Sequence, residues 1–199
     1  MSPPPRRHYE LKQRARRQEE TRQRIVDATV QLHREVGPAR TTVAEVARRA
    51  GVGRVTVYNH FPDEPSLLGA CSAQFVAASP PPDPGPWTQV QDPRARLREA
   101  LAATYAYFRA NEQMIANVTR DAATMPALAE LVAAGAAADY QEAMRDILLA
   151  GRGLRGARRR RVRAAIGLAL SFNAWQSLTR EGCSDGEAVE LMAGAVDAA

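Results

Sequence analysis

Residues Val43–Phe61, VAEVARRAGVGRVTVYNHF, have the spacing of two short helices joined by a tight turn. Where two helices cross closely, the first needs a small residue at the crossing, and Ala47 stands at that position. The turn needs a residue that tolerates a positive φ angle, which Gly51 supplies. Val52 and Val57 then provide apolar anchors for the second helix. Because these requirements are met together, the stretch predicts a helix-turn-helix.

The residues before this motif predict a preceding helix and a cap. Apolar residues recur at helical spacing over residues 25–36, and Gly37 supplies a left-handed end. Thr42 and Glu45 fit a capping box, in which the hydroxyl accepts from a first-turn amide and the carboxylate reaches back. We therefore expect the next helix to begin after Thr42 and to end at Gly51.

A third helix over about Arg54–His60 would have a polar outer side suited to contacts with DNA bases and phosphates. Arginines and the helix start at Thr42 would lie over the sugar-phosphate backbone, where helix amides favour anions. The residues expected to contact DNA on these grounds are Thr42, Arg48, Arg49, Arg54, Thr56, Tyr58, Asn59 and His60.

The distribution of charge agrees with a nucleic-acid partner. Residues 1–80 hold 13 Lys or Arg against 8 Asp or Glu, whereas residues 81–199 hold 14 of each. A polyanion that binds the first part would release counterions and gain affinity, and the second part shows no such preference.

Proline-rich segments divide the chain. Residues 1–18 begin with three consecutive prolines followed by arginines, which predicts a disordered basic arm. The segment SPPPDPGP at residues 79–86 cannot continue a helix because most of its residues lack an amide donor. The expected parts are therefore the arm, a helix-turn-helix domain over 19–79 and a second domain over 87–199.

The second domain is rich in Ala, Leu, Arg and Glu with little strand-like alternation, which favours helices. One long helix is predicted over Arg158–Arg180 and another after Gly182. Their apolar stripes and short connections indicate a bundle. The predicted fold class is therefore all-α, with an N-terminal three-helix helix-turn-helix domain and a C-terminal helical bundle.

Residues Thr21–Leu68 closely resemble the DNA-binding domain of the TetR family of transcription regulators. The match includes an amphipathic first helix, Gly37, a Thr-Thr pair and a TVYNHF segment similar to the family's TLYYHF. The resemblance implies about nine helices, with Phe61 holding the third against the fourth. It also implies that the following residues face DNA: Thr42, Arg54, Val55, Thr56, Tyr58, Asn59 and His60.

The sequence departs from the family at three positions near the motif. Val55 replaces a common Gly and adds an apolar contact able to meet a thymine methyl group. Gly53 replaces the usual Ser that caps the third helix and is a weaker cap. Glu64 replaces a Lys that often touches phosphate, and a carboxylate cannot make that contact.

The resemblance further implies a homodimer that binds a palindromic operator in double-stranded DNA and is released by a small, largely hydrophobic effector. Repression relieved by the effector is the expected behaviour. One alternative is an activator or global regulator of the same fold without an inducer. Another is a helical enzyme or carrier that binds a hydrophobic small molecule.

Aromatic and Met side chains at helical spacing are normally core residues, yet the resemblance implies a cavity among helices five to eight. For each polar candidate, a structural hydrogen bond is an equal alternative. The tentative ligand-contacting residues are Tyr105, Phe108, Met114, Asn117, Arg120, Asp121, Met125, Tyr140, Met144, Phe172, Asn173 and Trp175.

The sequence does not support a metal site, a disulfide, an enzyme active site or a membrane span. His8, His33 and His60 are scattered, and Cys71 and Cys183 lie outside any CxxC pattern, so neither a metal site nor a disulfide is expected. No nucleophile-elbow, Walker or dinucleotide motif occurs, so we expect neither an enzyme nor a cofactor. No run approaches the ~20 apolar residues of a membrane span, and a cytoplasmic location is expected.

The basic run Arg158–Arg161 favours a solvated helix surface. Pairing with Asp139, Glu142 or Asp146 is the only further role that the sequence indicates.

Overall fold

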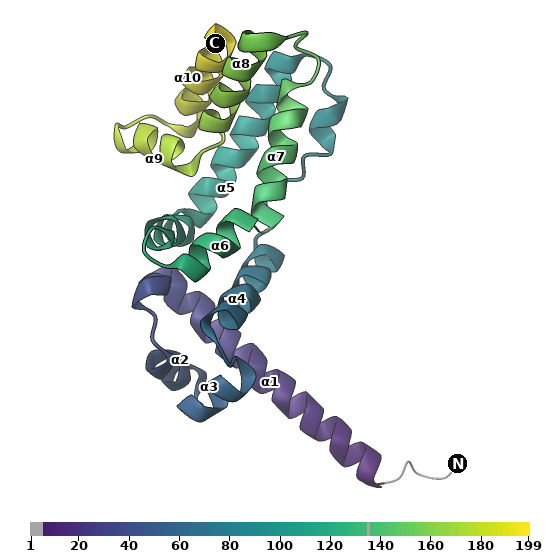
Figure 1. Cartoon of the computed structure of the whole chain (residues 1–199), viewed down its shortest axis with the longest axis vertical. Coiled ribbons are helices and arrows are strands. Elements are labelled where there is room, and N and C mark those ends of the chain that lie inside the picture. Colours follow the sequence, from purple (N-terminus) through teal and green to yellow (C-terminus); the bar gives the residue numbers. More distant parts are fainter. Residues whose placement is uncertain (1–5, 135) are drawn as a thin grey trace, which may run out of the picture. The chain divides into compact units, whose positions relative to one another are not determined.

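The computed structural model describes residues 6–134 and 136–199, and over these residues the chain is helical without strands (Figure 1). The prediction of an all-α fold is confirmed. The α-helices are α1 (Arg6–Glu35), α2 (Val43–Ala50), α3 (Arg54–His60), α4 (Glu64–Ala78), α5 (Pro93–Ala122), α6 (Pro126–Ala134), α7 (Ala136–Leu149), α8 (Gly156–Ala169), α9 (Phe172–Arg180) and α10 (Asp185–Ala198). Short 3-10 helices cover Pro38–Arg40 and Pro86–Gln89.

The chain folds into two compact units. The first unit contains the described residues up to Pro80 together with Ala116–Leu131, and the second contains Pro81–Ile115 and Val132–Ala199. The end of α5 and the start of α6 therefore belong to the first unit. The functional boundaries expected at 19–79 and 87–199 stay a prediction.

In the first unit, α1 packs against α2 and α4, and α2 packs against α3. The core contains the side chains of Ile25, Val46 and Val57, each at most 1% exposed. Burial of each such side chain contributes about 1.5–3 kcal/mol. Ala47 is buried at the helix crossing and Gly51 has φ 66°, so the predicted roles of both residues are confirmed.

The cap of α2 differs in one detail from the predicted capping box. The Thr42 hydroxyl accepts a hydrogen bond from the Glu45 amide at 3.2 Å, as expected. The Glu45 carboxylate instead binds the Arg48 guanidinium. A charge-assisted bond to an arginine one turn away outcompetes a backbone amide, so only half of the box forms.

The structure also corrects the expectation for the N-terminal arm. Residues 6–18 form the first turns of α1, whereas the sequence predicts disorder over 1–18. The residues after 10 are mostly Leu, Lys, Gln, Ala, Arg and Glu, which are strong helix formers. Arg16 and Glu20 add an ion pair one turn apart at 3.3 Å. The three prolines at positions 3–5 lie outside the described residues.

In the second unit, the long helix predicted over Arg158–Arg180 is broken into α8 and α9. Ser171 has φ −79° and ψ 130°, which is extended rather than helical backbone. The Tyr105 hydroxyl donates to the Ala169 carbonyl at 2.9 Å, so the break leaves this buried acceptor with a partner. The break also starts α9 at Phe172, a buried aromatic residue.

The described residues contain neither a candidate membrane span nor a candidate metal cluster. None of the helices there has the combination of length and apolar character that crossing a bilayer requires. Among the same residues, no three His, Cys, Asp or Glu side chains gather in a way that could hold a metal ion.

Candidate nucleic-acid interface

The inner side of α3 is anchored in the core of the first unit. Val57 and Phe61 are one turn apart and are 1% and 4% exposed. The Arg22 guanidinium lies 5.0 Å from the centre of the Phe61 ring, in a cation–π contact. Because these anchors fix the rotation of α3 about its axis, the opposite side of the helix must face outward.

The outer side of α3 combines polar and apolar groups. Val55 is 72% exposed and Tyr58 is 54% exposed, with Arg54 and Asn59 exposed beside them. Thr56 and His60 are half-buried at the two margins. Within the described part of the chain, no hydrogen bond or ion pair engages the side chains of Arg54, Tyr58 or Asn59. This side is therefore free to bind an external partner.

The arginines expected to contact phosphates already pair with carboxylates in the free protein. Arg48 binds Glu45 and lowers the pKa of that carboxyl group, while Arg49 binds Glu35 at 2.7 Å. Exposed ion pairs contribute only about 0–1 kcal/mol, so exchange of Glu for a phosphate would cost little. The predicted phosphate contacts of these arginines, and of the exposed residue Thr42, stay a prediction.

Three polar residues near the end of α5 hold the C-terminal end of α1, and we call Asn117, Arg120 and Asp121 the α1 clasp. The Asn117 side-chain amide donates to the carbonyls of His33 (3.0 Å) and Arg34 (2.8 Å). These are carbonyls that a helix end leaves without partners. The clasp thus satisfies the last turn of α1.

The clasp also fixes the turn after α1. The Ala39 amide donates to Asp121 Oδ2 at 3.0 Å, and Arg120 Nη2 donates to the Val36 carbonyl at 3.1 Å. Arg120 Nε donates to Asp121 Oδ1 at 2.7 Å, so the cation balances the buried carboxylate. The contacts of the clasp with Val36 and Ala39 join residues more than 80 positions apart, and no local signal in the sequence indicates them. A ligand role for the three residues stays a prediction.

His33 lies beside the clasp and is only 7% exposed. Burial lowers its pKa to about 4, with a partial offset from the charge of Asp121. The folded protein therefore keeps His33 neutral where the unfolded chain, with a pKa near 6.5, already takes up a proton.

Acidification is expected to destabilise the first unit through His33. The stability from the neutral imidazole is fully present above about pH 6.5 and is lost as the pH falls towards 4. Between about pH 7 and pH 5 the expected loss is about 2 kcal/mol. Urea unfolding across this range measures it, and His33→Gln should flatten the slope. An equally steep slope in the variant would exclude His33 as the cause.

The remaining ligand candidates fall into separate groups. Tyr105, Phe108, Phe172 and Trp175 form an aromatic cluster in the second unit, with neighbouring ring centres 5.4–6.2 Å apart. Burial raises the pKa of Tyr105. The other candidates do not join this set of rings. Met114 and Met144 are buried, and Asn173 is exposed. The Tyr140 hydroxyl donates to the Pro82 carbonyl at 2.9 Å. Met125 is half-buried and belongs to the first unit.

Comparison with known sequences places the motif in a family. The model of the bacterial regulatory proteins of the tetR family matches residues 25–71. The uncharacterised HTH-type transcriptional regulator Mb2274c of Mycobacterium bovis is 42% identical over 55 residues, which are 28% of this chain and 29% of that protein. The HTH-type transcriptional regulator BetI of Yersinia pestis is 33% identical over 88 residues, covering 39% and 40% of the two chains. The matches thus span less than half of these relatives.

Solved structures extend the likeness of fold to most of the chain. A TetR-like transcriptional regulator from Rhodococcus has a TM-score of 0.60 at 16% identity, covering 88% of this chain and 93% of its own. NalD of Pseudomonas aeruginosa, the secondary repressor of an efflux pump, has a TM-score of 0.58 at 22% identity, covering 90% and 96%. These relatives and neighbours carry the names of regulators, not of enzymes. Residues 25–71 thus match the model of the tetR family, and the all-helical fold of the chain is similar to that of solved regulators.

Proposed function

We propose that this protein is a sequence-specific DNA-binding transcription regulator that reads base edges with α3 in the major groove. The observation that carries the proposal is the outer side of α3, which is exposed and free of internal partners while Val57 and Phe61 anchor its inner side. A helix of this kind can enter the major groove without loss of its own packing.

Each exposed group on α3 suits a feature of DNA. An arginine such as Arg54 can bind guanine through two hydrogen bonds, and an asparagine such as Asn59 can do the same with adenine. The methyl groups of Val55 suit contact with the methyl group of thymine. Arg48 and Arg49 would bind phosphates after they leave their carboxylate partners, which positions the protein without selecting a sequence.

The proposal includes a homodimer on a palindromic operator. Leu168 of α8 and Leu191 of α10 are 59% and 52% exposed in the single chain, and burial against a second copy would remove them from water. A dimer with two-fold symmetry binds a DNA site with the same symmetry, and its two recognition helices lie about 34 Å apart.

We further propose that the protein is a cytoplasmic repressor that a largely hydrophobic small molecule releases from DNA. The repressor named among the fold neighbours supports this direction of control. Release requires that the effector bind more tightly to a state with lower operator affinity, and the shift equals that difference in affinity.

The decisive experiment begins with selection of a preferred duplex from genomic fragments. The double variant Thr56→Ala, Tyr58→Ala should then bind this duplex at least about 30-fold more weakly, since each good base contact contributes about 1–3 kcal/mol. Affinity for a random duplex should change little because the phosphate contacts remain. Thr179→Ala, a matched change in the second unit, should bind as the parent does. Unchanged, selective retardation by the double variant would refute the proposal.

A further inference from the structure

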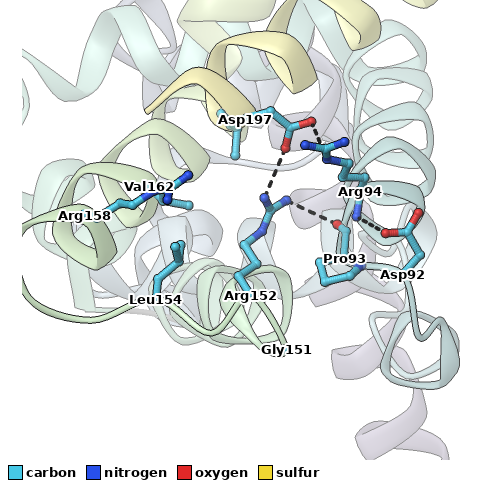
Figure 2. Close-up of a pocket in the computed structure, with 10 residues that line it drawn as sticks. Asp92, Pro93, Arg94, Gly151, Arg152, Leu154, Arg158, Val162 and Asp197 are labelled. Atoms are coloured by element: carbon cyan, nitrogen blue, oxygen red, sulfur yellow. Dashed lines mark hydrogen bonds and ion pairs between the residues drawn. The ribbon is translucent and has the colours of Figure 1, made fainter.

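The second unit contains a cleft of about 430 Å³, within the range of small-molecule sites. It lies between the start of α5, the connection from α7 to α8, the first turns of α8 and the end of α10. Figure 2 shows Arg158 and Val162 on one side of it and Arg94, Arg152 and Asp197 on another. The lining includes none of the ligand candidates predicted from the sequence.

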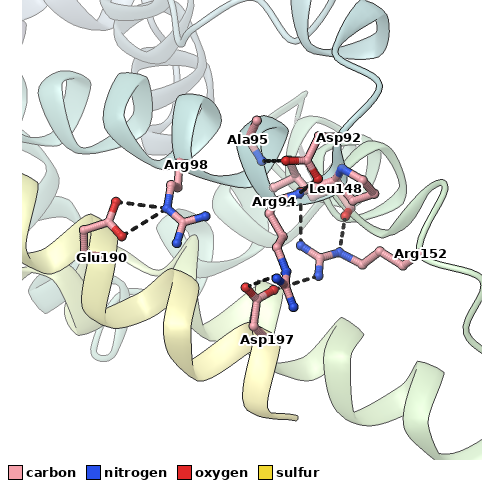
Figure 3. Close-up of polar contacts among 9 residues, drawn as sticks. Asp92, Arg94, Ala95, Arg98, Leu148, Arg152, Glu190 and Asp197 are labelled. Atoms are coloured by element: carbon pink, nitrogen blue, oxygen red, sulfur yellow. Dashed lines mark hydrogen bonds and ion pairs between the residues drawn. The ribbon is translucent and has the colours of Figure 1, made fainter.

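One wall of the cleft is held rigidly by the buried guanidinium of Arg152, whose side chain is 9% exposed. It donates to Asp197 Oδ1 (3.2 Å) and to the carbonyls of Pro93 (3.2 Å) and Leu148 (3.1 Å). Arg94 lies 3.2 Å from the other oxygen of Asp197 (Figure 3). A wall fixed by several bonds needs little reorganisation when a ligand binds.

The charges around the cleft do not balance. Its lining contains Arg94, Arg152 and Arg158 but only Asp92 and Asp197, which leaves a formal charge of one positive. Asp197 accepts from two of the arginines, and Asp92 accepts from the backbone amides of Arg94 and Ala95 at the start of α5. No acceptor among the described residues binds Arg158. The surplus cation is therefore at Arg158.

The rest of the lining is apolar. Leu154 and Pro93 are half-buried and line the space, and Val162 and Val196 lie behind them, buried in the wall. The side chains of Leu154 and Pro93 offer a small surface for a hydrocarbon body but no hydrogen bonds. A ligand that complements the cleft thus needs one negative group and an apolar remainder.

We propose that this cleft binds an organic monoanion, with a carboxylate paired to Arg158 and an aromatic or aliphatic body against Leu154 and Pro93. A guanidinium suits a carboxylate because it can form two parallel hydrogen bonds. The site also gives Arg158 a role that its position in a basic run does not explain. The inference goes beyond the proposed function, since binding requires neither DNA nor a change in its affinity.

Calorimetric titration of the intact protein with 1-naphthoate tests this site without DNA. We expect saturable binding of one naphthoate per chain. The neutral probe 1-naphthalenemethanol, which has the same rings, should bind at least about tenfold more weakly, since a charge-assisted bond contributes about 1.5–3 kcal/mol. Acetate, which lacks the apolar body, should give no saturable heat in the same range.

Substitutions in and near the cleft test whether naphthoate binds there. Arg158→Gln should weaken naphthoate binding at least about tenfold, whereas Arg160→Gln, a change of the same charge in the same helix away from the lining, should have no effect. Leu154→Trp should also weaken binding because it fills the space, and circular dichroism checks its fold. Equal affinity in the two arginine variants would overturn the proposal, as would unchanged binding by folded Leu154→Trp or the absence of saturable binding by the parent.

Discussion

Replacement of Trp175 by alanine is expected to lower the free energy of unfolding of the second unit by about 3–5 kcal/mol. Trp175 is completely buried, and its ring centre lies 5.7 Å from that of Phe108 and 5.5 Å from that of Phe172. Loss of the indole removes these contacts and leaves a cavity that the surrounding helices can only partly fill. The cavity adds to the lost transfer free energy.

The same substitution disturbs a polar arrangement at the edge of the cluster. The Trp175 indole donates to Asp185 Oδ1 at 2.9 Å, and the Arg109 guanidinium lies 4.7 Å from the centre of the ring. Arg109 also pairs with Asp185 at 2.8 Å and holds the pKa of that carboxyl group below its usual value. Because this pair is partly exposed, it contributes little to stability, and the loss comes mainly from packing.

Chemical unfolding followed by circular dichroism measures the effect. Trp175→Phe is the matched control, since it keeps an aromatic ring and loses the indole N–H. It should cost less than the alanine variant, about 1–2 kcal/mol. If Trp175→Ala lost less than about 1 kcal/mol, the cluster would not be the main packing element of α5 and α9.

The sequence predicted the helix-turn-helix well because its signals are local. Gly51 ends α2 and Thr42 caps it through interactions within one turn, and α3 has the bounds Arg54–His60 expected from the motif. The outer side of α3 followed from the position of Val57, since a buried anchor fixes which residues face outward. Here local preference and tertiary packing require the same structure.

The features that sequence reasoning missed depend on contacts between distant residues. The break at Ser171 is accompanied by a hydrogen bond from Tyr105, more than 60 positions away. The pairing of Arg49 with Glu35 and the attachment of Asp121 to Ala39 likewise join separate elements. Local propensity contains no information on such partners. The cleft at Arg158 also arises only when four separate segments meet, so the basic run alone gave no sign of it.

Gly37→Ala is expected to be among the most damaging single changes in the first unit, with a loss of about 2–5 kcal/mol. Gly37 has φ 95° and ψ 159°, a conformation that is essentially limited to glycine. A Cβ atom there would also overlap the Asp121 carboxylate and the Arg120 guanidinium. Relief of that overlap requires Asp121 to move away from the Ala39 amide.

The α1 clasp increases the free energy that this overlap costs. Asp121 is only 4% exposed, and a displaced carboxylate would lose its bonds to the Ala39 amide and to Arg120 without access to water. The costs of backbone strain and of the displaced charge therefore add at Gly37, unlike at a glycine with an ordinary φ angle and open space around it. Gly53 is such a position, since its φ is −78° and the nearest neighbour of an added Cβ is Thr56 Oγ1 at 3.8 Å.

Urea unfolding and amide hydrogen exchange together test the two contributions. Gly53→Ser, the matched control, should gain a few tenths of a kcal/mol because it supplies a cap for α3. In Gly37→Ala, the Ala39 amide should exchange much faster than in the parent if the clasp has opened. Retained protection of that amide together with a large loss of stability would assign the effect to backbone strain alone. A variant as stable as the parent would show that the turn after α1 does not need the clasp to keep its shape.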